Sequence, residues 1–189
     1  MFGLRHLISA AAGVLLLTGS AYAQTPIFTI SSTTIKDGNL MPKKVAGANK
    51  ANPNCVGENV SPQLSWTNVP AGTTSFALIM TDPEGRGGLG VDHFHAYGIP
   101  ASVTSFAENE LSAASDKYVG GIGTNKANTY LGPCTPPNQT AHHYTFVLIA
   151  TDLDTKALPA GLTRLELLEK LTGHTKGTTG IVGLFKNPL

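Results

Sequence analysis

A glycine-rich segment between two apolar runs limits the folds open to this chain more than any other part of the sequence. Residues 76–80 form one apolar run and residues 94–99 form the other, with four glycines between positions 85 and 90. Glycine allows the chain to reverse, and Pro83 cannot continue a hydrogen-bonded strand. The sequence therefore predicts two strands joined by a turn, which would bring Asp82 back beside His93.

The second of these strands carries two histidines, His93 and His95. Side chains two residues apart in a strand share a face, so we expect both imidazoles to point the same way. The expected result is a cleft at the strand ends that contains the Asp82 carboxylate and one or two imidazoles.

The first 23 residues have the pattern of an export signal. Arg5 precedes a short apolar stretch at residues 7–17, and Ala-Tyr-Ala at residues 21–23 fits a cleavage site. The apolar stretch is too short to span a membrane, although an uncleaved anchor stays an alternative. We expect a periplasmic or secreted protein, not an integral membrane protein, whose mature chain is a single domain of residues 24–189.

Charge and cysteine content narrow the possible functions. The 13 basic and 12 acidic residues nearly cancel, which gives no electrostatic argument for binding nucleic acid. Cys55 and Cys134 are the two cysteines, and an even pair in an exported protein predicts a disulfide. A thiol active site with the nearby His142 is the alternative.

The rest of the chain reads mostly as strands. We expect them within residues 26–35, 64–66, 144–150 and 181–185, with a long irregular connection at residues 102–127. The one clear helix is predicted at residues 163–172. Thr163 and Glu166 would form its capping box, leucines 165, 167, 168 and 171 its apolar stripe, and Gly173 its end.

The ordered set of motifs resembles the phosphatidylethanolamine-binding protein family, including its bacterial branch. The motifs are Asp-Pro-Glu at residues 82–84, the strand-entry His93, Gly-Pro at residues 132–133 and His-His-Tyr at residues 142–144. The family has Asp where this chain has Glu84, and its animal members carry Arg where this chain has His143. His142 and Tyr144 should share one strand face while His143 points away.

The resemblance implies a mainly antiparallel β fold, with a large central sheet, a smaller sheet and few short helices. It also implies a small cleft that binds a phosphorylated anion or a phospholipid head group, with no cofactor, no bound metal and no catalysis. Some family members act on partner proteins, including kinases, so a protein partner is a further expectation. Carried over to this sequence, the cleft residues and its rim are Asp82, His93, Gly132, Pro136, His142 and Tyr144.

Three other functions stay open at this point. His93 and His95, with Asp82, Glu84, Asp92 and His142, supply the residue types of a zinc enzyme. Ser61 or Ser65 would be the nucleophile of a hydrolase, although neither stands in a Gly-x-Ser-x-Gly motif. The histidines would otherwise only satisfy buried polar groups.

Overall fold

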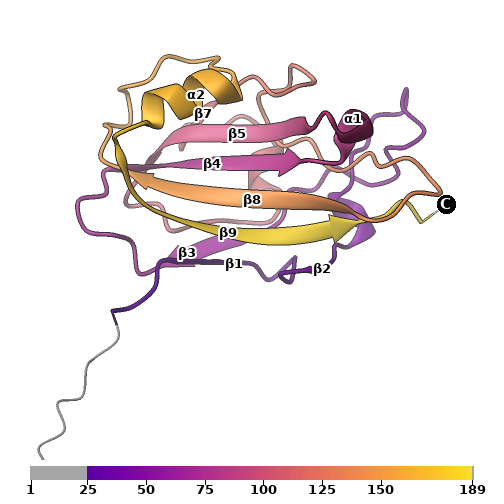
Figure 1. Ribbon diagram of the computed structural model, residues 1–189, viewed down its shortest axis with the longest axis horizontal. Helices are drawn as coiled ribbons and strands as arrows, with labels where there is room; N and C mark the ends of the chain where they lie inside the picture. Colours follow the sequence, from indigo (N-terminus) through magenta and orange to yellow (C-terminus); the bar gives the residue numbers. More distant parts are fainter. Residues whose placement is uncertain (1–24, 189) are drawn as a thin grey trace, which may run out of the picture.

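Two β-sheets and one helix form three layers in the computed structural model, which describes residues 25–188. The helix α2 covers one face of the large sheet and the smaller sheet lies on the other (Figure 1). The expected export signal and its cleavage site lie outside the described residues.

The large sheet has six strands in the order β2-β9-β8-β4-β5-β7. Neighbouring strands are antiparallel except β2 and β9, which are parallel. The bounds are β2 Asn39–Leu40, β4 Ser75–Asp82, β5 Val91–Pro100, β7 Val119–Gly120, β8 His142–Thr151 and β9 Thr175–Phe185.

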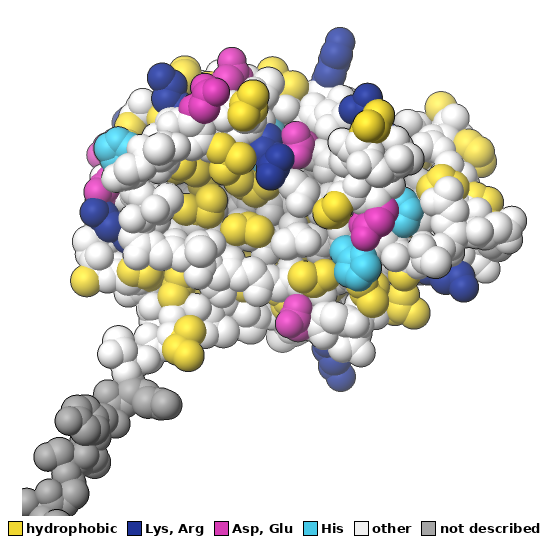
Figure 2. Space-filling model, in the orientation of Figure 1, with side chains coloured by type: hydrophobic (Ala, Val, Ile, Leu, Met, Phe, Trp, Pro, Cys, Tyr) yellow, Lys and Arg dark blue, Asp and Glu magenta, His cyan; other side chains and the backbone are white. Residues whose placement is uncertain are grey.

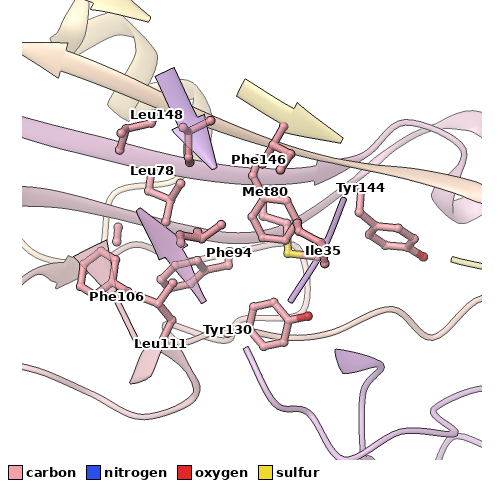
Figure 3. Close-up of a cluster of buried hydrophobic side chains, with 14 of the residues drawn as sticks. Ile35, Leu78, Met80, Phe94, Phe106, Leu111, Tyr130, Tyr144, Phe146 and Leu148 are labelled. Carbon is pink, nitrogen blue, oxygen red and sulfur yellow. The ribbon is translucent and has the colours of Figure 1, made fainter. Parts of the chain in front are cut away.

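The smaller sheet has three antiparallel strands in the order β1-β3-β6, which are Thr29–Ser31, Leu64–Thr67 and Ser105–Phe106. The larger of the two hydrophobic clusters fills the space between the sheets and includes Trp66, Phe76 and Leu78. Figure 3 shows part of this cluster, in which rings and aliphatic side chains from distant segments pack together. Trp66 is a core residue, since its large apolar ring is buried among these side chains.

The other face of the large sheet packs on α2, Arg164–Leu171. Thr163 and Glu166 form the predicted capping box, and Gly173 follows the helix with a φ of 84°. The predicted apolar stripe is wrong at Leu165, which is 69% exposed, whereas Leu167 and Leu171 are buried. Eight residues give barely two turns, so only one face of the helix can reach the sheet.

The predicted mainly β fold with a large and a smaller sheet is confirmed, but several details differ. The last strand is much longer than residues 181–185, because β9 also includes a Thr- and Gly-rich stretch without an apolar pattern. The connection at residues 102–127 contains β6, β7 and the 3₁₀ helix Glu110–Ser112, and a second 3₁₀ helix spans Lys43–Val45. The glycine-rich turn includes the short helix α1, Gly85–Gly88.

Across residues 25–188, no helix has the length and apolarity needed to span a membrane.

Candidate functional site

A cleft of about 300 Å³ lies at the end of the large sheet where β4, β5 and β8 approach α1. Figure 1 shows α1 at this end, beyond the last residues of β4. The walls include Asp82, His93, Pro136, His142 and Tyr144, five of the six residues expected to form the site. Segments far apart in the sequence therefore meet in one place, as the motif order implied.

Asp82 is the last residue of β4 and is 3% exposed. Its Oδ1 accepts hydrogen bonds from the backbone N–H groups of Glu84 (3.0 Å) and Gly85 (2.9 Å), which close the turn into α1. A Cβ on Gly85 would lie 3.1 Å from Asp82 Oδ2 and 2.6 Å from a methyl carbon of Val91. Glycine at position 85 therefore allows the turn to pack directly against the carboxylate.

The other oxygen of Asp82 faces two imidazoles. Oδ2 lies 2.9 Å from His142 Nδ1 and 3.9 Å from His93 Nε2. Burial alone would raise the pKa of Asp82, but the interactions with His93 and His142 outweigh it and hold that pKa well below its usual 3.8. Asp82 is therefore ionised at neutral pH and fixes the orientation of the His142 ring.

The protonation of His142 follows from its partners. A carboxylate only accepts hydrogen bonds, so His142 Nδ1 carries a proton and donates it to Asp82. The second ring nitrogen, Nε2, lies 3.1 Å from Gln139 Oε1 on the cleft side. When Nε2 is also protonated the ring is a cation, with a donor that a ligand can take over from Gln139.

His93 is held in a similar way from the opposite wall. Its Nδ1 lies 2.8 Å from the carbonyl oxygen of Leu131, so this nitrogen must be the donor. Nε2 is then left facing Asp82 and the cleft. The two histidines thus present the same ring nitrogen to the same cavity.

The expectation that His93 and His95 share a face is wrong. In the ladder Met80 pairs with Phe94 and Thr81 with Asp92, so His93 is an extra residue, a β-bulge, in β5. The bulge turns His93 toward Tyr144, with ring centroids 5.1 Å apart. His95 keeps the regular alternation, lies under α2 and bonds the carbonyl oxygen of Leu162 through Nε2 at 2.9 Å. His95 therefore fits the alternative in which a histidine only satisfies a buried polar group.

Tyr144 forms the floor of the cleft. Its ring is buried at the edge of the hydrophobic cluster and its hydroxyl points away from that cluster (Figure 3). The hydroxyl lies 2.8 Å from Thr135 Oγ1. Burial raises the pKa of Tyr144 well above its usual 10.0, so the hydroxyl stays neutral and can both donate and accept.

Glu84 and His143 pair at the mouth of the cleft. Glu84 Oε1 lies 2.7 Å from His143 Nδ1, and Oε2 accepts from the His143 backbone N–H at 3.1 Å. Burial raises the pKa of Glu84, but these bonds outweigh it and lower the pKa overall. Acidic and histidine side chains lie together on this face below α1 (Figure 2). His143 therefore points away from the cavity that His142 and Tyr144 line, as expected for alternate strand residues.

The rim segment after Tyr130 is fixed by its backbone and by a disulfide. Gly132 was expected to form part of the rim, but it is not among the residues that line the cleft. A Cβ there would lie 2.0 Å from the carbonyl oxygen of Val45, so Gly132 allows close packing of two backbones. The predicted disulfide joins Cys55 to Cys134, which leaves no thiol for catalysis at this position.

Several cleft residues were not expected from the sequence. Gln139 was missed because its loop has no strand or helix pattern, although it stands only three residues before His142. The Leu131 carbonyl was missed because backbone groups leave no signal in the sequence. Arg86 also lines the cleft, from α1.

The two enzyme alternatives gain no geometric support. Within residues 25–188, no three His, Cys, Asp or Glu side chains are arranged to hold a metal ion. Ser61 is buried and accepts a hydrogen bond from the Leu111 N–H, and Ser65 faces Ser31 in the smaller sheet. Neither serine is near the imidazole pair that lines the cleft.

Several known proteins are similar to this chain in sequence. The sequence model described as phosphatidylethanolamine-binding protein matches residues 31–186. A UPF0098 protein of Aquifex aeolicus is 31% identical over 165 residues, which are 85% of this chain and 89% of that protein. The putative lipoprotein LppC of Mycobacterium tuberculosis is 31% identical over 169 residues, 89% of this chain and 77% of that protein.

A solved structure is similar over nearly the whole fold. It is the crystal structure of Escherichia coli YbcL, described as a new member of the mammalian PEBP family. Its TM-score is 0.75 at 26% identity, and the match covers 84% of this chain and 98% of that one.

Proposed function

The chain belongs to the phosphatidylethanolamine-binding protein family, and on this basis we propose that its cleft binds a small phosphate-bearing anion without chemically changing it. The anion is either a free phosphate ester or the head group of a phospholipid. The observation that carries the proposal is the pair of histidine Nε2 atoms directed at one cavity, each on a ring whose Nδ1 is already committed.

The charge of the cleft suits an anion once both rings are protonated. Among Asp82 and the two imidazoles, one cationic ring only neutralises the carboxylate, and the second makes this group of three positive. A negative charge beside an imidazole stabilises its cationic form, so a bound anion favours this state of both rings. Tyr144 and Thr135 add neutral hydroxyl groups to hold phosphate oxygens.

The size of the cavity favours a head group over a whole lipid. About 300 Å³ is at the lower end of small-molecule pockets, which start at about 300 Å³. Most of the walls named above are polar or aromatic, and the apolar Pro136 and Val91 do not form a long channel for acyl chains. We therefore place the phosphate inside and any lipid tail outside the cleft.

We also propose that the protein acts outside the cytoplasm, in the periplasm or as a secreted protein. The export-like pattern of residues 1–23, the Cys55–Cys134 disulfide and the similarity to a putative lipoprotein support this location. The expected protein partner stays a prediction.

Titration calorimetry of the mature protein with phosphate and phosphoethanolamine tests the anion site. We expect saturable binding that His142→Ala weakens at least about tenfold, because a hydrogen bond to a charged group is lost. His174→Ala is the matched control, since His174 is exposed and pairs with Asp152 instead of lining the cleft. Equal affinity in wild type and His142→Ala would overturn the proposal.

A further inference from the structure

A second hollow adjoins the cleft on the other side of the α1 turn. It is a groove of about 350 Å³, and it shares Asp82, Arg86 and Val91 with the cleft wall. The groove adds Thr124 and Arg164 as polar walls. The cleft and the groove therefore share a wall, and Arg86 belongs to both.

Arg86 stands at the junction in an unusual backbone conformation. Its φ of 54° and ψ of 38° place it in the left-handed region, which costs a non-glycine residue free energy. Among residues 25–188, no carboxylate lies within ion-pair distance of its guanidinium. The turn thus holds an uncompensated cation between the two hollows.

The far wall of the groove adds a second arginine. Arg164 is the first residue of α2, and its Nε lies 3.6 Å from Asp92 Oδ1, too far for a tight hydrogen bond. Thr124 Oγ1 accepts from the Asp92 N–H at 2.9 Å, which leaves its own hydrogen to donate. Figure 2 shows basic and acidic side chains together near the end of α2 that faces α1.

The acidic groups nearby are already engaged. Asp82 faces the two cleft histidines, Glu84 pairs with His143, and Asp92 pairs with Arg164. None of these carboxylates pairs with Arg86, so its guanidinium is the cation that a ligand in the groove can reach. A planar guanidinium is well suited to bind a carboxylate or a phosphate through two parallel hydrogen bonds.

From this arrangement we propose that the ligand carries two anionic groups, a phosphate bound in the cleft and a second anion bound in the groove by Arg86 and Arg164. The inference rests on the proposed function, since it presupposes a phosphate in the cleft. It assigns the ligand class: a phosphate ester with a carboxylate or a second phosphate on its alcohol part.

A matched pair of ligands tests the second anion. O-phosphoserine is phosphoethanolamine with one added carboxylate, and glycerophosphoserine is related in the same way to glycerophosphoethanolamine. We expect calorimetry to give each serine compound an affinity at least about fivefold higher than that of its ethanolamine partner. The monoester and diester pairs distinguish a free phosphate ester from a lipid head group as the source of the phosphate.

Two double variants test whether the groove causes the higher affinity for the serine compounds. The double variant Arg86→Gln with Arg164→Gln should bind both members of each pair equally. The double variant Lys36→Gln with Lys156→Gln removes the same charge from exposed positions elsewhere and should keep the preference. Equal affinities in wild type, or a preference that survives loss of both arginines, would refute the second anion site while phosphate binding stands. Absence of phosphate binding in wild type would refute the proposed function as well.

Discussion

Asp82 stabilises the cleft through both of its carboxylate oxygens. Oδ1 closes the turn into α1, and Oδ2 faces His142 and His93. Since its pKa is lower in the folded protein than in the unfolded chain, the ionised carboxylate adds stability. That contribution is complete above the ordinary carboxylate pKa and is lost as the pH falls below it. Removal of this one charge should therefore change both stability and its pH dependence.

We predict that Asp82→Asn lowers the free energy of unfolding at pH 7 by about 3 kcal/mol, because it removes the buried carboxylate that both imidazoles face. The variant should also lose part of the decline in stability that wild type undergoes between about pH 5 and pH 2. Urea unfolding over a pH series measures both effects.

Glu84→Gln is the control for Asp82→Asn. Its pair with His143 is substantially exposed, so this change should cost less than about 1 kcal/mol. If both variants were equally stable and had the same acid profile, the Asp82 interactions would not contribute as described.

At the level of elements, apolar runs and capping residues predicted strands and the helix correctly. Backbone irregularities could not be predicted from the sequence. The run at residues 76–80 predicted β4, and Thr163 with Glu166 predicted the start of α2. The bulge at His93 depends on how β5 pairs with β4, which no local pattern records. For that reason the sequence analysis predicted that His93 lies near Asp82, but it assigned His95 to the wrong face of β5.

The disulfide should stabilise the rim segment more than any other element of the fold. Cys55 and Cys134 are 79 residues apart, and closing a loop of that size is worth about 4 kcal/mol in the chain-entropy model. We predict that replacing both cysteines by Ala lowers the free energy of unfolding by up to about that amount and increases hydrogen exchange at residues 130–140.

Reduction provides the control for this prediction. A reductant should lower the stability of wild type toward that of the double variant and leave the double variant unchanged. A double variant as stable as oxidised wild type would contradict a stabilising role of the bridge.

Across the whole molecule, the layered fold explains why the cleft lies at one end of the sheet. One face of the large sheet packs on the smaller sheet and the other on α2, so β4 is buried along most of its length. Its polar end is the first place where charged side chains can reach solvent. The order of the motifs was enough to predict five wall residues. Gln139 lies in a loop and Arg86 in the short helix α1, and the path of both segments depends on long-range packing, so neither residue could be predicted.

The measurement that most directly tests the central claim is site-resolved NMR of the histidine ring nitrogens during a phosphate titration at constant pH. The described chain contains five histidines, of which only His93 and His142 line the cleft. We predict saturable shifts of Nε2 in these two rings, in the direction of protonation, with His95 and His174 unchanged. Signals of His93 and His142 that stay constant up to saturating phosphate would contradict an anion site built on this imidazole pair.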